Sequence, residues 1–539
     1  MSEVSTGPTP VGAGLDAKSS GGGTGRSTYQ SGAMGGGVSV SRLTRRTWHM
    51  VAVAGASAAG MILAACGGDA PAAAPTAAPT AAAKAEPTKA PAAPAPTAAQ
   101  AAATAAPAPT VAPAAAKAPV EITYQTFFPQ QRLDLLAGSF KIFAEKNPSI
   151  KANVVFDADH RAKLATQMAA DSAPDTFIHD VWSAAKYYEA GGILDLTSRF
   201  AVDKIDLARD YSLIGIEQWC GKSYAVPFYV TSMLLAYNKD LLKKFGAPDP
   251  WEKWNGQWTW DDFLSVAKQV TKAPGADSPT GSWGLVMDGN GIDNIDRNLQ
   301  VWMTSNGGET YDVPNMKYTL DDPKSIEAMD FLVKLINEQK VMAGPDEWKK
   351  ISDTLGTTDP FAAGVIGFRQ ESTGRLSVYS QQVGDKFEWD VVPFPSGKGS
   401  KFIGHSDADV TNVAAKGKNL DAAYTFAKFL GGEETQGALA QNKLLIPALK
   451  KAADDTATFL KPPPKHLQAF VEPLRSGQFR TSFYHYNGLE ALRVQNEQLK
   501  RAVMKETTVK EAMLEANRAA NAQVKFGSCR QTVTWKARG

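Results

Sequence analysis

The stretch from Gly221 to Phe245, GKSYAVPFYVTSMLLAYNKDLLKKF, constrains the fold of this chain more than any other. Its apolar run from Tyr224 to Tyr237 is too long for one ordinary strand. Because Pro227 cannot donate to a central ladder, we expect the run to divide there or to cross between two sheets. Asn238 or Asp240 then caps a helix. A long strand that bends at a proline and feeds a helix is what the hinge of a two-lobed protein needs.

Composition excludes several functional classes. A net charge of +2, from 57 basic and 55 acidic side chains, gives no electrostatic argument for nucleic-acid binding. The three cysteines form no CxxC pair, and the six histidines show no HExxH spacing, so we expect no metal and no cofactor. A chain of 539 residues has room for roughly two to four domains.

Residues 1–65 predict a disordered N-terminus followed by a lipoprotein signal peptide. Residues 1–40 are rich in Gly, Ser and Thr, and Arg45 and Arg46 then precede an uncharged segment that ends in Leu63-Ala64-Ala65-Cys66. This ending resembles the lipobox of bacterial lipoproteins, in which the cysteine is lipidated; a chance cysteine after an apolar run is the alternative. The paired arginines resemble a Tat signal, but the choice between Sec and Tat export stays open.

Residues 66–119 predict a tether. They consist almost entirely of Ala, Pro, Thr and Lys, so prolines prevent a helix and no core can form. In polyproline II geometry, at ~3.1 Å per residue, the segment could reach roughly 150 Å. We therefore expect an exported protein, anchored through a lipid on Cys66 to the outer face of the cell membrane.

Strands and helices alternate in the next part of the chain, which predicts an α/β fold with a parallel sheet. The expected strands are 120–124, 150–156 and 174–178, and the expected helices are 132–146 and 161–170. Ligands of such sheets bind beyond the carboxyl ends of the strands. The candidates at these ends are Phe128, His179, Asp180 and Trp182.

Aromatic and charged residues farther along are further candidates. Thr259, with Asp262 as its capping-box partner, predicts the start of another helix. Arg369 and Glu371 follow an expected strand at 361–368, where they would form either a solvated pair or a site for hydroxyls or an anion. The aromatic candidates, for which core packing is the alternative, are Tyr229, Trp283, Trp302 and Tyr484.

His405, Asp407 and Asp409 alternate, so on a strand all three would face one side. We considered a metal site and ligand hydrogen bonding, and because a fourth metal ligand is lacking, His405 and Asp407 are candidates for the latter. The candidate ligand-binding residues are thus Phe128, His179, Asp180, Trp182, Tyr229, Trp283, Trp302, Arg369, Glu371, His405, Asp407 and Tyr484.

Several of these motifs, in the same order, resemble those of the extracellular solute-binding proteins of bacterial ABC importers, in the family that includes the maltose-binding protein. They include the hinge stretch, the Pro174-Asp175 strand, Thr259-Trp260, the segment 361–368 and TVKEAMLEANRAANAQ near the end. The tryptophan that stacks on sugar in maltose-type members aligns here with His179, so that role is not carried over.

The resemblance implies a type II periplasmic-binding-protein fold with two lobes joined by hinge crossovers. Lobe one would comprise 120–226 plus 408–460, lobe two 227–407 plus 461–524, and a tail 525–539. This tail holds Cys529, whose pairing with Cys220 stays open.

The function implied is capture of a sugar or oligosaccharide in the interlobe cleft by a monomer, with delivery to membrane permease subunits and without catalysis. Glycerol phosphate esters, polyamines or peptides are alternative cargoes. A tethered glycoside hydrolase is the alternative of another class, although no recognisable carboxylate pair supports it. A structural or adhesive lipoprotein would leave the hinge motifs unexplained.

Overall fold

The computed structural model describes residues 119–527, apart from 181, 213–214, 277, 288–294, 313, 358 and 526. The predicted signal peptide, Cys66, the tether as far as residue 118 and Cys529 lie outside the described residues. Cys220 is disulfide-bonded. Among the described helices, none combines the length and the apolar character needed to cross a membrane.

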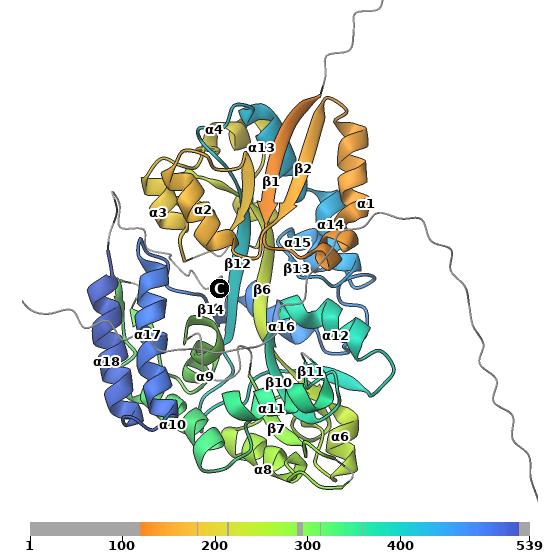
Figure 1. Cartoon of the computed structure of the whole chain (residues 1–539), viewed down its shortest axis with the longest axis vertical. Helices are drawn as coiled ribbons and strands as arrows, with labels where there is room; N and C mark the ends of the chain where they lie inside the picture. Colours follow the sequence, from red (N-terminus) through yellow and green to blue (C-terminus); the bar gives the residue numbers. More distant parts are fainter. Residues whose placement is uncertain are drawn as a thin grey trace, which may run out of the picture. The chain divides into compact units, whose positions relative to one another are not determined.

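A ten-stranded mixed sheet organises the described chain (Figure 1). Its main path runs β2-β1-β3-β12-β6-β10-β7, while β11 and β13 pair with β6 and β14 pairs with β12. The strands are β1 Val120–Thr126, β2 Ile150–Phe156, β3 Thr176–His179, β6 Ala225–Asn238, β7 Trp283–Val286, β10 Ile366–Ser372, β11 Trp389–Val392, β12 Gly404–Val413, β13 Ile446–Pro447 and β14 Phe479–Arg480. Two short hairpins lie outside this sheet, β4 Gln218–Trp219 with β5 Lys222–Ser223 and β8 Tyr311–Asp312 with β9 Lys317–Tyr318.

Lobe one is built around β1, β2 and β3, which pair in parallel as the alternation of strands and helices predicts. Its helices are α1 Gln130–Lys146, α2 His160–Ala169, α3 Ala184–Glu189, α4 Thr197–Asp203, α5 Leu207–Asp210, α13 Leu420–Leu430, α14 Glu433–Gln441 and α15 Lys450–Ala453. Helices that are far apart in the sequence share one core, since the ring centroids of Phe143 in α1 and Phe426 in α13 lie 4.9 Å apart.

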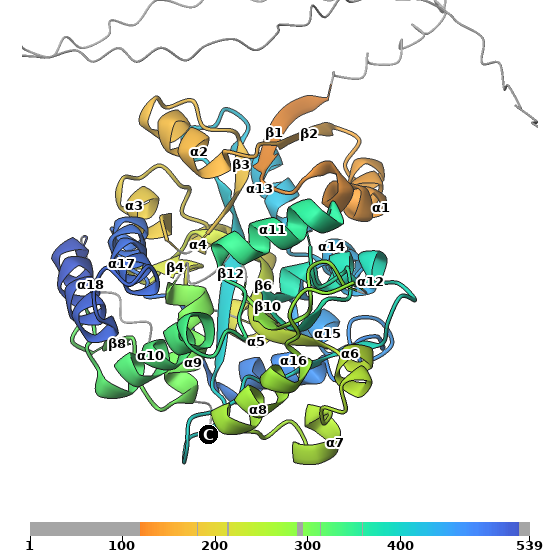
Figure 2. The ribbon, with the colours of Figure 1, turned by 60° about the horizontal axis from the view of Figure 1, so that its bottom comes forward.

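Lobe two is built around β7, β10 and β11. Its helices are α6 Lys239–Lys244, α7 Pro250–Trp254, α8 Trp260–Val270, α9 Gln300–Ser305, α10 Pro323–Asn337, α11 Pro345–Leu355, α12 Leu376–Gln382, α17 Gly488–Val503 and α18 Val509–Gln523, and α16 Gln468–Ser476 packs on β6 and β12. A π-helical turn, Ile295–Leu299, leads into α9. Both views place α17 and α18 together at one edge of the molecule (Figures 1 and 2).

The hinge strands β6 and β12 pass through both lobes. β6 does not divide at Pro227: it stays continuous for 14 residues. Its first part pairs with β12, and from Met233 onward it pairs with β10, with β11 also pairing along its last residues, so the run crosses between lobes. The β12 register shifts between Asp409 and Val410, opposite Pro227, and such a bulge accommodates a residue that cannot donate a ladder hydrogen bond.

Local capping signals are confirmed. Asn238 caps α6 by accepting a hydrogen bond from the Leu241 amide at 2.8 Å. Thr259 and Asp262 form the expected capping box at the start of α8. The strand expected at 361–368 begins only at Ile366, because Phe361 to Gly364 forms a turn instead.

Candidate functional site

A cavity of about 440 Å³ lies between the lobes, within the range of ~300–1,000 Å³ typical of small-molecule sites. Its walls come from the β1–α1 segment and the end of β3 in lobe one, from β10 to α12 in lobe two, and from both hinge strands. The lining residues are Phe127, Pro129, Gln131, Arg132, Leu135, Arg161, Asp180, Trp182, Tyr229, Thr231, Arg297, Glu371, Ser372, Gly374, Arg375, Ser377, Val378, Gln381, Asp407, Ala408, Asp409 and Leu445.

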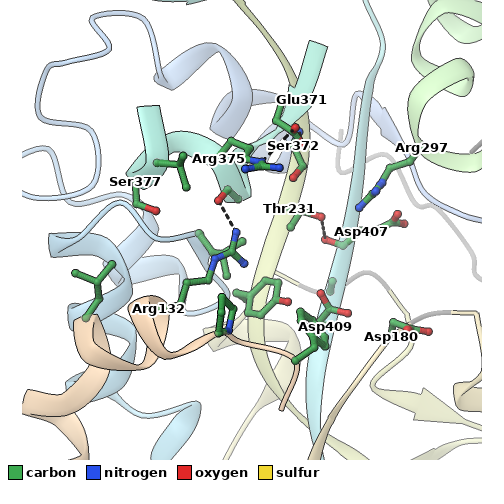
Figure 3. Close-up of a pocket in the computed structure, with 18 of the residues that line it drawn as sticks. Arg132, Asp180, Thr231, Arg297, Glu371, Ser372, Arg375, Ser377, Asp407 and Asp409 are labelled. Atoms are coloured by element: carbon green, nitrogen blue, oxygen red, sulfur yellow. Dashed lines mark hydrogen bonds and ion pairs between the residues drawn. The ribbon is translucent and has the colours of Figure 1, made fainter. Parts of the chain in front are cut away.

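The hinge strands supply polar groups to this cavity. Tyr229 and Thr231 alternate on β6, and Asp407 and Asp409 alternate on β12, so each pair faces the same side. The Thr231 hydroxyl donates to the carbonyl of Asp407 at 3.4 Å (Figure 3). A movement of one lobe about these strands would therefore change the cavity directly.

Asp407 is held rigidly as an anion. His405 lies 3.0 Å from its Oδ2, the Ser482 hydroxyl donates to the same oxygen, and the Thr481 hydroxyl and the Ser482 amide donate to Oδ1. Burial alone would raise the pKa of Asp407, but His405 and these donors outweigh burial and lower the pKa to about 2. Asp407 is therefore a carboxylate throughout the physiological pH range.

Asp409, two residues along the same strand, behaves oppositely. Burial and the nearby charge of Asp180 raise its pKa to about 7, although a hydrogen bond from Tyr229 and the charge of Arg161 partly oppose them. Near neutral pH the cavity thus contains both a fixed carboxylate and a carboxyl group that exchanges its proton.

Asp180, Arg161 and Trp182 form one unit at the end of β3. Arg161 makes an ion pair with Asp180, and the Trp182 amide donates to the other carboxylate oxygen at 3.2 Å. The Arg161 guanidinium also lies 4.8 Å from the centre of the Trp182 ring. Because a guanidinium covers this ring and only 6% of Trp182 is exposed, little of its face is available for stacking on a sugar.

On the opposite wall, one carboxylate serves two guanidinium groups. Glu371 Oε2 lies 3.1 Å from Arg369 and 3.4 Å from Arg375. Arg369 is buried, and its guanidinium lies 4.5 Å from the centre of the Trp348 ring. Arg369 therefore pairs with Glu371 from outside the cavity lining, and of these three charged residues only Glu371 and Arg375 line the cavity.

Five of the predicted site residues line the cavity together: Asp180, Trp182, Tyr229, Glu371 and Asp407. Arg369 and His405 contact cavity residues from outside the lining. The others lie in hydrophobic packing. Phe128 stacks on Tyr229 at 5.6 Å, and Trp302 is fully buried with its indole donating to Gln370.

His179, Trp283 and Tyr484 lie away from the lining. His179 is buried against Tyr187 and contacts Ser183 at 2.9 Å, and burial lowers its pKa to about 4. Trp283 lies on the edge strand β7 and packs against the core. Tyr484 is buried with its ring 5.2 Å from that of Trp219.

Sequence reasoning missed all four arginines that line the cavity and Phe127, a lining aromatic that keeps partial exposure. Arg132 lies in the first turn of the helix that follows β1, and Arg375 lies in the short turn that follows β10; their place after the carboxyl end of a strand was the available signal. No cluster of His, Cys, Asp and Glu suited to a metal ion occurs among the described residues, so the alternation of His405, Asp407 and Asp409 does not assemble one there.

Comparisons with known proteins agree with this architecture. The family model for the bacterial extracellular solute-binding protein matches residues 119–437. The arabinooligosaccharide-binding protein of Bacillus subtilis is 24% identical over 217 residues, covering 40% of this chain and 46%, about half, of that relative. An uncharacterized lipoprotein of Streptomyces antibioticus is 26% identical over 359 residues, covering 63% of this chain and 73% of the relative.

Among solved structures, the ABC substrate-binding protein of Listeria monocytogenes in complex with cycloalternan superposes with a TM-score of 0.64. It is 24% identical and covers 75% of this chain and 98% of its own. This likeness shows the fold, two lobes of the type II periplasmic-binding-protein class, which confirms the predicted fold class. Since the family match spans more than half of the chain, this protein belongs to the bacterial extracellular solute-binding proteins.

Proposed function

We propose that this protein is the substrate-binding component of an ABC importer, which captures a carbohydrate between its lobes and delivers it to membrane permease subunits. The observation that carries the proposal is a cavity lined by both lobes and by the two strands that connect them. A ligand that contacts both walls favours the closed arrangement by its differential affinity for that state.

The lining suits a polyhydroxylated ligand. Glu371 is a hydrogen-bond acceptor, Thr231 and Ser377 are hydroxyl groups, and Phe127 is a partly exposed ring for an apolar sugar face. Relatives named for binding arabinooligosaccharide and diacetylchitobiose support this class of cargo. Glycerol phosphate esters, polyamines and peptides are the alternative cargoes within the same family.

The protein acts as an exported monomer anchored through a lipid on Cys66. The family's extracellular character and the relative named as a lipoprotein support this proposal, together with Leu63-Ala64-Ala65-Cys66. The lobe boundaries follow the predicted hinge crossings, 120–226 plus 408–460 and 227–407 plus 461–524.

Binding without catalysis is favoured over a glycoside hydrolase. The cavity does hold a carboxyl of raised pKa, Asp409, beside three further acidic residues, Asp180, Glu371 and Asp407, a combination that glycoside hydrolysis requires. However, Asp407 already accepts hydrogen bonds on both oxygens, and Asp180 is engaged by Arg161 and by the Trp182 amide. Glu371 is likewise paired with Arg369 and Arg375, so none of the three carboxylates is poised as a nucleophile or base.

A thermal-shift screen of the full chain against mono- and oligosaccharides tests the proposal. A ligand that binds the native state alone stabilises it by ~2.7 kcal/mol at a hundredfold excess over its dissociation constant. A raised midpoint with one sugar class, and unchanged sugar on chromatography, is the expected result. A response only to glycerol phosphates, polyamines or peptides would overturn the cargo, and cleaved sugar would overturn binding without catalysis.

A further inference from the structure

Charged side chains crowd the cavity. Four arginines and four acidic residues line it, so the formal charges balance; they are Arg132, Arg161, Arg297, Arg375, Asp180, Glu371, Asp407 and Asp409. However, the positive and negative charges are not equally engaged by the groups that contact them. The acidic groups are engaged within the walls, whereas two arginines keep positive charge directed into the cavity.

Each acidic group is already compensated. Asp180 pairs with Arg161, and both oxygens of Asp407 already accept hydrogen bonds from Thr481 and Ser482. Asp409 loses much of its charge near neutral pH, since burial raises its pKa to about 7. Glu371 divides one negative charge between Arg369 and Arg375, which leaves positive charge in excess on that wall.

Arg132 brings a second positive charge from lobe one. It lies in the first turn of α1, and its Nη2 donates to the carbonyl of Gly374, across the cavity in lobe two, at 2.8 Å. No carboxylate of the described residues forms an ion pair with it. A carbonyl oxygen satisfies one donor of a guanidinium that has five, and it cancels none of the charge.

Arg375 directly follows Gly374, so the two guanidinium groups approach each other from opposite walls (Figure 3). Burial is the main cause that lowers the pKa of Arg132, and the charge of Arg375 adds to it, while Tyr229, Glu371 and Asp409 oppose it. Two guanidinium groups repel unless an anion lies between them, and they bind carboxylate and phosphate oxygens in bidentate geometry.

The cavity offers comparatively little for a neutral sugar ring to stack on. Of its three aromatic lining residues, Tyr229 is 2% exposed and Trp182 is covered by Arg161, which leaves Phe127. We propose that the ligand is an acidic carbohydrate, whose carboxylate or phosphate group is held between Arg132 of lobe one and Arg375 of lobe two. This inference rests on the proposed function and narrows its substrate class.

Calorimetric titration of the full chain with matched ligands tests the inference. One series compares glucose with glucuronate and glucose 6-phosphate, a second compares galactobiose with digalacturonate, and glycerol 3-phosphate and inorganic phosphate serve as anions without a sugar. We expect an acidic member to bind roughly tenfold to a hundredfold more tightly than its neutral counterpart, as charge-assisted hydrogen bonds predict. The preference should weaken as salt is added.

Arg132→Gln and Arg375→Gln should each remove most of this preference while a neutral sugar retains its affinity. Arg209→Gln is the matched control, because Arg209 is an exposed arginine paired with Asp210 outside the lining. Unfolding midpoints of all three variants show whether each remains folded. If one cavity variant does not fold, the other cavity variant provides the test. An unchanged preference in a folded cavity variant contradicts the inference.

The panel separates the possible failures. Neutral sugars that bind as tightly as their acidic counterparts would overturn the anion site and keep the proposed function. If glycerol 3-phosphate or inorganic phosphate binds through Arg132 and no sugar binds, the anion site is supported and the proposal that the ligand is a carbohydrate is contradicted. If no member binds, both fail. Preference for uronates over sugar phosphates, or the reverse, identifies the source of the negative charge.

Discussion

Replacement of Asp409 by asparagine should remove a pH dependence from the stability of this protein. The folded state holds the Asp409 proton more tightly than the unfolded chain, because the pKa is about 7 in the fold against an ordinary 3.8. The free energy of unfolding therefore falls as pH rises from the pKa of Asp409 in the unfolded chain to its pKa in the folded protein. The Asp409→Asn variant carries no charge at this position, so it does not show this loss.

The magnitude follows from the same pKa. At about 1.4 kcal/mol per tenfold change in ionisation, the difference between 3.8 and about 7 sets a ceiling of about 4 kcal/mol. Asp409 is only partly buried and borders the cavity, so water screens its charge. We therefore expect the wild type to lose about 1–2 kcal/mol between pH 5 and pH 8 that the variant keeps.

Urea unfolding at several pH values measures this difference without any ligand. Asp407→Asn is the matched control from the same strand. The pKa of the Asp407 carboxylate is lowered in the folded protein. The stability that it contributes is therefore present above the pKa of Asp407 in the unfolded chain, and it is lost only as pH falls toward about 2. The control should therefore keep most of the wild-type slope between pH 5 and pH 8, since the charge of Asp407 is the smallest of the causes that shift the pKa of Asp409. An Asp409→Asn variant with that same slope would refute the reasoning.

Three further predictions concern stability and covalent structure. At neutral pH, Asp407→Asn should destabilise the protein by about 2 kcal/mol, measured by urea unfolding, because charge-assisted hydrogen bonds to His405 and Thr481 are lost; an unchanged midpoint would contradict this. Trp302→Ala should cost about 3–5 kcal/mol in the same assay, since the ring is fully buried, and a cost under about 1 kcal/mol would place it outside the core. Peptide mapping without reduction should find Cys220 linked to Cys529, and a different partner for Cys220 would disprove that pairing.

Local signals account for the parts of the fold that the sequence predicted. Asn238 and Thr259 cap helices by accepting hydrogen bonds from amides three residues away, so their role depends on neighbours along the chain. The hinge was also predictable, since fourteen residues exceed an ordinary strand, but Pro227 alone did not show whether the strand would break. The answer depended on pairing with β12, about 180 residues distant, where the register shifts between Asp409 and Val410.

The candidate site was less predictable because its members meet only in three dimensions. Trp182 and Trp302 look alike in the sequence, yet one lines the cavity and the other fills the core of lobe two. Arg132 and Arg375 are 243 positions apart, and their approach follows from the contact between Arg132 and Gly374. Arg369 has the residue type expected of a ligand group, but its burial under Trp348 gives it a supporting position.

Interlobe closure on a carbohydrate is the central claim, and a distance measurement between the lobes tests it most directly. Spin labels can replace Lys141 on α1 and Lys268 on α8, two exposed positions on different lobes. Pulsed electron paramagnetic resonance then gives the distance between them with and without a saturating carbohydrate from the binding screen. We predict that the distribution shortens and narrows when the sugar binds. An unchanged distribution, with binding shown in the same sample, would contradict the claim.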